Sequence, residues 1–173
     1  ENMTLYAQWK FMNGWLTDET GKQYYIDGKV QKTGWIEIDG ETYYLDTETG
    51  YAAAGLRELV PKGGTEEALF AFDADGVFQG DKTGLYDVGN DTYWINSGVV
   101  EKDKGLTQVK DKNGNNLYYY FGEDGKAVKN VPTGGQDFWI SKEKTNELLP
   151  EWGYYFDENG VILHDEQFQN GVC

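Results

Sequence analysis

Two copies of one short pattern stand in tandem within residues 14–55. Gly14-Trp15 is followed by Tyr24-Tyr25-Ile26-Asp27, and Gly34-Trp35 is followed by Tyr43-Tyr44-Leu45-Asp46. Self-similarity at a period of about 20 residues is typical of repeat architectures, in which neighbouring units share a core. The tandem therefore predicts a stacked array of similar units.

The aromatic tetrad recurs beyond the tandem, and its first and third positions are always large and apolar. The further copies begin at Phe70, Tyr93, Tyr119, Phe138 and Tyr154. Successive side chains of a strand point to opposite faces, so the first and third positions share one face, which we assign to the core, and the second faces outward. For the tandem this predicts the following core set: Tyr24, Ile26, Ile36, Ile38, Tyr43 and Leu45.

Turn residues divide the chain at regular intervals. Six tetrads are followed by a dipeptide that ends in glycine, such as Asp27-Gly28 or Asn159-Gly160, which is a signal for a hairpin or turn tip. The glycines that open the units, at 14, 34, 55, 84 and 105, are separated by 20, 21, 29 and 21 residues. The longer gap predicts a loop insertion near residues 61–65. Residues 143–149 form either an irregular loop or one helical turn.

The fold class predicted from these patterns is all-β. The expected architecture is a β-solenoid of stacked β-hairpin repeats, partly degenerate and with loop insertions.

The charge of the chain limits its partners. Thirty acidic and 15 basic side chains give a formal charge of −15, which repels nucleic acid and anionic membranes. The acids either attract a cationic ligand or keep an aromatic-rich surface soluble. No apolar run approaches the roughly 18 residues of a membrane-spanning helix, so we expect no membrane insertion.

Residues that carry catalytic or metal chemistry are scarce. The chain has one histidine, His164, and one cysteine, Cys173, and it contains no Gly-x-Ser-x-Gly, HExxH, P-loop or dinucleotide motif. The stretch from Asp73 to Gly76 resembles the start of a calcium loop, but the later oxygen ligands are missing. We therefore expect no enzyme activity, no metal and no cofactor.

The succession of Gly-Trp, an aromatic pair, Asp and a turn glycine resembles the choline-binding or cell-wall-binding repeat of Gram-positive surface proteins. Glucan-binding repeats and the repeats of clostridial toxins are related to it. Residues 1–10 resemble the last strand of a Listeria–Bacteroides repeat. The resemblance implies a terminal strand of a preceding surface module at 1–10, and an array of about six to seven repeats over 11–173.

In choline-binding members of this family, aromatic cages lie in the grooves between repeats. Their walls are the tryptophan of Gly-Trp, a tryptophan just before the tyrosine pair, and the second tyrosine of the pair. The tryptophan just before the tyrosine pair is missing here, since Gln23 and Thr42 stand in its place in the first two units. The resemblance, with the equivalent positions of two later units, gives these candidate ligand-binding residues: Trp15, Tyr25, Trp35, Tyr44, Trp94 and Trp139.

Two functions remain open from the sequence. The first is a noncatalytic module, secreted or at the cell surface, that attaches a protein to choline-substituted teichoic acid or to a polysaccharide. The second is a degenerate-repeat spacer or protein-interaction stalk of a surface adhesin. Outward aromatics either stack on the ligand or are covered by the next coil, and the sequence does not fix the oligomeric state.

Overall fold

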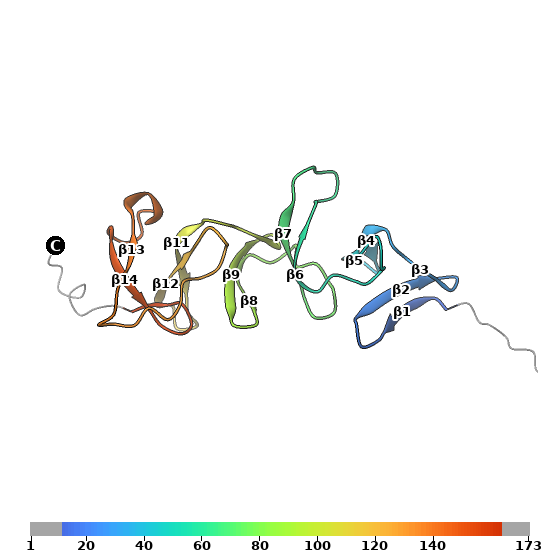
Figure 1. Ribbon diagram of the computed structural model, residues 1–173, viewed down its shortest axis with the longest axis horizontal. Coiled ribbons are helices and arrows are strands. Elements are labelled where there is room, and N and C mark those ends of the chain that lie inside the picture. Colours follow the sequence, from blue (N-terminus) through green and yellow to red (C-terminus); the bar gives the residue numbers. More distant parts are fainter. Residues whose placement is uncertain (1–11, 164–173) are drawn as a thin grey trace, which may run out of the picture. The chain divides into compact units, whose positions relative to one another are not determined.

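The chain forms two compact units, Glu1–Gly80 and Asp81–Cys173. The computed structural model describes residues 12–163, and within them each unit is a series of short antiparallel hairpins (Figure 1). The predicted all-β class is confirmed, because the one helix in this part of the chain is the 3-10 turn η1, Lys142–Lys144. The strand predicted at residues 1–10, His164 and Cys173 all lie outside the described residues.

From residue 12 onward, the first unit contains seven strands in three groups. They are β1 (Gly14–Thr17), β2 (Lys22–Ile26), β3 (Lys29–Val30), β4 (Gly34–Ile38), β5 (Glu41–Leu45), β6 (Gly55–Leu59) and β7 (Ala68–Phe72). Strands β1, β2 and β3 pair in that order, β4 pairs with β5, and β6 pairs with β7. The connection between β6 and β7 is the long loop that the 29-residue gap predicted.

The described part of the second unit, up to residue 163, repeats this plan with eight strands. They are β8 (Gly84–Val88), β9 (Asp91–Asn96), β10 (Val99–Val100), β11 (Gly105–Lys110), β12 (Asn116–Phe121), β13 (Phe138–Ile140), β14 (Trp152–Phe156) and β15 (Ile162–Leu163). Strand β9 pairs with both β8 and β10, β11 pairs with β12, and β14 pairs with both β13 and β15. Each of these pairings is antiparallel.

The alternation of the tetrads largely predicts the core. First and third positions are buried in five of the seven tetrads, as Tyr43 with Leu45, Phe70 with Phe72, Tyr93 with Ile95, Tyr119 with Phe121, and Tyr154 with Phe156. The prediction is wrong for Ile26, which is 45% exposed beside the Asp27–Gly28 turn. Tyr24 and Ile36 are only half-buried, whereas Ile38 is buried.

The first two hairpins differ in register by one residue. In the second, Gly34 lies opposite Leu45 and the two-residue turn 39–40 joins the strands. In the first, Gly14 lies opposite Tyr25, because a four-residue loop, 18–21, joins β1 to β2. When the pairing of two strands shifts by one residue, each side chain of one strand shares a face with a different set of side chains on the other strand. The tryptophans of the two Gly-Trp pairs consequently have different tyrosines as neighbours.

Segments that follow a hairpin return to the hairpin before it. The Ala52 N–H donates to the Lys22 carbonyl at 2.7 Å, and Phe78 N–H donates to Thr42 at 2.8 Å. In the second unit, Ala127 N–H donates to the Thr92 carbonyl at 2.7 Å. Each of these bonds joins one hairpin to its predecessor within the same unit, so consecutive hairpins share both backbone pairing and core.

Turn glycines fit closely against the preceding hairpin. Gly125 has a φ of +80°, and a Cβ there would lie 2.6 Å from Val100 Cγ1. Gly50 is equally tight, since its Cβ would lie 2.6 Å from Val30 Cγ2. Such distances are shorter than van der Waals contact, so only glycine satisfies both the left-handed backbone and the packing.

Replacing Gly125 measures this packing. Gly114 has a similar φ of +85° but open space around it, so Gly114→Ala is the matched control. Both variants carry the left-handed cost of roughly 1–2 kcal/mol. Gly125→Ala should lose about 1–3 kcal/mol more in unfolding free energy, because the methyl group overpacks against Val100. Urea unfolding of both variants measures this difference, and equal losses of unfolding free energy in the two variants would contradict the close packing of Gly125.

Candidate functional site

Trp35 is the centre of the densest aromatic cluster in the first unit. It lies on β4 directly opposite Tyr44 of β5, so the two side chains share one face of the hairpin. Their ring centroids are 5.4 Å apart in an edge-to-face arrangement. Strand pairing thus brings together two of the predicted ligand-binding residues.

Rings from the next hairpin surround the same indole. Phe70 and Phe78 contact Trp35 edge-to-face at 5.0 and 5.4 Å, and Phe72 stacks on it at 5.7 Å. The Trp35 Nε1–H donates to the Val60 carbonyl at 2.8 Å. Trp35 is therefore a packing residue anchored to the inserted loop, yet it stays half-exposed.

A groove of about 250 Å³ opens beside this indole. Its lining consists of Trp35, Ile36, Glu37, Thr42, Pro61, Lys62, Phe70 and Phe78. Drug-sized ligands occupy pockets of roughly 300–1,000 Å³, so this groove suits a small group. Aromatic faces attract cations through their quadrupole, and the Glu37 carboxylate adds a negative charge at the edge. The lining also includes Lys62, so the groove carries one carboxylate and one ammonium group, and its aromatic faces are the feature that favours a small organic cation.

The first predicted cage is not assembled in the same way. Because of the slipped register, Trp15 lies opposite Tyr24, and its ring contacts Tyr24 at 5.1 Å and Tyr43 at 4.7 Å. Tyr25 lies opposite Gly14, and its hydroxyl donates to Gln23 Oε1 at 3.0 Å. The Lys22 ammonium lies 4.7 Å from the centroid of Trp15.

The two tryptophans predicted in the second unit have different surroundings. Trp94 is half-buried against Phe121 at 6.3 Å, and the Lys104 ammonium lies 5.1 Å from its ring. Trp139 is 59% exposed on β13. Trp152 of β14, which the sequence reasoning did not single out, is 55% exposed. The last hairpin thus presents two large aromatic surfaces to solvent.

Phe70 and Phe78 are the groove residues that sequence reasoning missed. The alternation of the tetrad placed Phe70 in the core, which is correct, but one edge of it still lines the groove. Phe78 follows the turn glycine Gly76 and returns to pair with the preceding hairpin. The position of Phe78 shortly after a turn glycine could have indicated its place in the groove. The segment that follows such a turn pairs with the preceding hairpin and brings a side chain beside the Gly-Trp of that hairpin.

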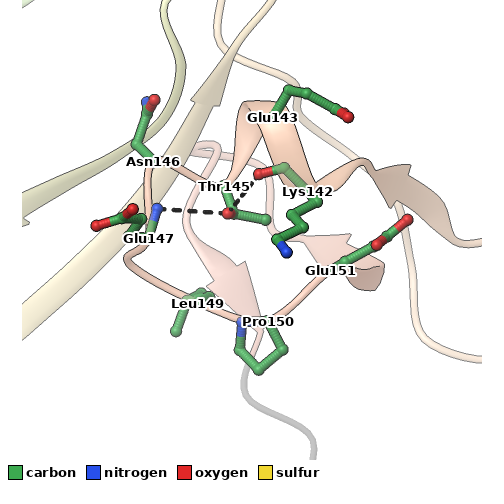
Figure 2. Close-up of a pocket in the computed structure, with 8 residues that line it drawn as sticks. All are labelled: Lys142, Glu143, Thr145, Asn146, Glu147, Leu149, Pro150 and Glu151. Atoms are coloured by element: carbon green, nitrogen blue, oxygen red, sulfur yellow. Dashed lines mark hydrogen bonds between the residues drawn. The ribbon is translucent and has the colours of Figure 1, made fainter.

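A larger hollow of about 850 Å³ lies in the second unit, within the loop that contains η1 (Figure 2). Figure 2 shows the Thr145 hydroxyl at its centre, donating to the Lys142 carbonyl at 2.9 Å. The lining includes Glu143, Glu147 and Glu151 and no aromatic side chain. It therefore lacks the faces that hold an organic cation.

Tyr154 fastens this loop to β14. Its hydroxyl donates to the Pro150 carbonyl at 2.6 Å, and burial raises the pKa of Tyr154 to about 12. An unfolded tyrosine titrates near pH 10, so the folded state keeps its proton to a higher pH. The contribution of Tyr154 to stability is therefore complete below about pH 10 and is lost as the pH rises toward 12.

Tyr154→Phe tests this linkage. At pH 8 the variant should lose about 0.5–1.5 kcal/mol in unfolding free energy, because the donor to Pro150 is removed. The stability difference from the wild type should shrink as the pH rises from 10 toward 12. Urea unfolding at several pH values measures the difference, and a constant value would show that Tyr154 does not titrate with the predicted sign.

A second pair of variants compares the contribution to stability of a packed tryptophan with that of an exposed one. Trp35→Ala should reduce the unfolding free energy by about 3 kcal/mol, because four ring contacts and one hydrogen bond are lost. Trp139→Ala should stay within about 0.5 kcal/mol of the wild type, because the side chain is mostly in solvent. Chemical unfolding of both variants gives the comparison, and similar losses would contradict the assigned roles.

No group of three or more His, Cys, Asp or Glu side chains within residues 12–163 could hold a metal ion. The same residues contain no helix that is long and apolar enough to cross a membrane. Asp73, which resembled the start of a calcium loop, accepts the backbone N–H groups of Asp75 and Val77 at 2.9 Å. Its carboxylate thus serves the local turn.

Two solved structures are similar to this chain over most of its length. Choline binding protein F from Streptococcus pneumoniae is 21% identical, covering 88% of this chain and 41% of that one, with a TM-score of 0.47. Truncated alternansucrase from Leuconostoc mesenteroides is 25% identical over 67% of this chain and 10% of that one, with a TM-score of 0.45. The chain therefore spans well under half the length of these proteins. No curated protein matches the sequence.

The comparison with family models identifies the repeat. The model described as "Putative cell wall binding repeat", of the choline-binding type, matches residues 33–51 and 151–162. The first match covers the β4–β5 hairpin, which carries Trp35 and Tyr44, and the second covers β14 and the start of β15. The matched segments and the repeated tetrads around them thus make these hairpins similar to the choline-binding type of cell wall binding repeat.

Proposed function

We propose that the chain is a noncatalytic binding module that attaches a protein to choline-substituted teichoic acid, or to a surface polysaccharide. The observation that carries the proposal is the Trp35 groove. It places aromatic faces beside the Glu37 carboxylate and the Lys62 ammonium group, and part of it lies on the β4–β5 hairpin that the cell wall binding repeat matches. We place the protein at the cell surface for the same reason.

The chemistry of the groove favours a quaternary ammonium group. Such a group carries no hydrogen-bond donor, so it is held by ring faces at roughly 0.5–2 kcal/mol per contact. Trp35, Phe70 and Phe78 supply rings, and Glu37 supplies the opposite charge. The formal charge of −15 further attracts a cationic polymer substituent. Glu37 and Thr42 could instead accept hydrogen bonds from sugar hydroxyls.

The proposed architecture is a β-solenoid formed by the repeats of residues 11–173. Its support is the backbone bonding of each returning segment to the preceding hairpin. A single groove of this kind binds weakly. A polymer with many choline groups raises the effective concentration at each groove, so weak sites suffice for attachment when several act together.

The alternative function, a spacer or interaction stalk, also has structural support. The rings of Trp15 and Trp94 face lysine ammonium groups of the same chain, and Trp35 is anchored by Val60. In a spacer these aromatics would serve packing alone. Binding at the Trp35 groove separates the two functions, because a spacer would show none.

Titration with choline tests the proposed function. The indole N–H signal of Trp35 should shift in NMR spectra at millimolar choline, as expected for a weak site. Glu37→Gln should weaken choline binding about five-fold, which corresponds to ~1 kcal/mol for one charge at an exposed site. Glu19→Gln removes the same charge outside the groove and should bind as the wild type does.

A parallel titration with glucan oligosaccharides separates the two ligand classes. A shift of Trp35 with choline alone supports choline-bearing polymer, and a shift with the oligosaccharide alone supports polysaccharide. If neither ligand shifts the indole N–H signal of Trp35 at millimolar concentration, the result would contradict the binding function and favour the spacer.

A further inference from the structure

A lysine of the chain itself occupies the aromatic face of Trp15. The Lys22 ammonium lies 4.7 Å from the ring centroid, donates to the Asp75 carbonyl at 3.1 Å, and lies 3.8 Å from the Asp75 carboxylate. Tyr24 and Tyr43 also contact the Trp15 indole. Ring faces and a nearby carboxylate thus surround a cation that belongs to the protein.

Strand pairing explains why Lys22 reaches this position. Trp15 lies opposite Tyr24, and Lys22 is two residues before Tyr24 on the same strand, so all three side chains share one face. In the second hairpin Trp35 lies opposite Tyr44, and the residue two before Tyr44 is Thr42. The position that holds a lysine beside Trp15 therefore holds a short, uncharged side chain beside Trp35, where the groove is open.

The second unit contains the same arrangement, reached by another route. The Lys104 ammonium lies 5.1 Å from the Trp94 ring and forms an ion pair with Glu101. Glu101 also accepts from Asn96 Nδ2 at 2.8 Å, and the hydrogen bond from Lys104 lowers the pKa of Glu101. Lys104 lies in the segment between β10 and β11, whereas Lys22 lies on a strand of its own hairpin.

We propose that Lys22 and Lys104 are built-in cations that fill the aromatic faces of Trp15 and Trp94 and exclude external quaternary ammonium groups from them. A second cation at either ring would meet a like charge and displace an ammonium group already bonded to the protein. Among these three tryptophans, the chain thereby leaves only Trp35 open to ligand, a consequence that rests on the proposed function. The exclusion at Trp15 and Trp94 does not depend on it.

Lys22→Met tests the exclusion, because methionine keeps an unbranched apolar side chain and removes the charge. Tetramethylammonium is the probe, and the indole N–H signals of the six tryptophans report where it binds. The Trp15 signal should titrate at least five-fold more tightly in Lys22→Met than in the wild type. Lys29→Met, which removes an exposed charge on β3, should leave the titration of the Trp15 signal as weak as it is in the wild type.

The same titrations distinguish the two proposals. A change of the Trp35 indole signal on titration of the wild type supports the proposed function. A tighter titration of the Trp15 indole signal in Lys22→Met than in the wild type supports the exclusion. Equal titration of Trp15 in the wild type and in Lys22→Met, or no titration of Trp15 in the variant, would overturn the exclusion. If Lys22→Met does not fold, the wild type decides: the Lys22 ε-methylene protons should be shifted upfield by the ring, and ordinary shifts would refute the contact.

Discussion

The return of each segment to the preceding hairpin is the interaction on which the structure depends. A lone two-stranded hairpin is marginally stable in water, and the hairpins of this chain are short. Bonds such as that from Ala52 to Lys22, and from Ala127 to Thr92, add a further segment to each hairpin and cover its apolar face. Turn glycines then sit so close to the preceding hairpin that Gly50 and Gly125 have no room for a Cβ.

Much of this fold is predictable from the sequence, because alternation along a strand is a local property. Leu45, Phe72 and Phe121, which are fully buried, were all assigned to the core from the tetrad alone. Register was not predictable in the same way. The segment between Gly14 and Tyr24 is one residue longer than the segment between Gly34 and Tyr43. The extra residue lengthens the loop of the first hairpin and shifts its strand register by one residue.

Of the predicted ligand-binding residues, Trp35 lines the groove, whereas Tyr44 contacts Trp35 and is not part of the lining. Trp35 and Tyr44 meet because they are paired across one hairpin, a relation that a repeat pattern reveals. Phe70 and Phe78 reach the groove from the following hairpin, and the length of the inserted loop does not indicate how its strands return. From the sequence it was possible to name the cage wall that this chain lacks at Thr42, but not the rings of Phe70 and Phe78 that line the groove around it.

The tandem repeats show how one position can set the use of an aromatic face. Aromatic rings in an acidic protein attract any cation, including the lysines of the chain. In the first two hairpins, the side chain that stands two residues before the cross-strand neighbour of the tryptophan decides whether a lysine fills the ring face. Lysine at position 22 reaches the Trp15 ring, while threonine at position 42 is too short to reach Trp35 and carries no charge. Loss of family tryptophans is therefore only one way in which a repeat degenerates. A repeat that keeps its tryptophan can equally be converted from a ligand site to an internal contact by one basic residue on the same face.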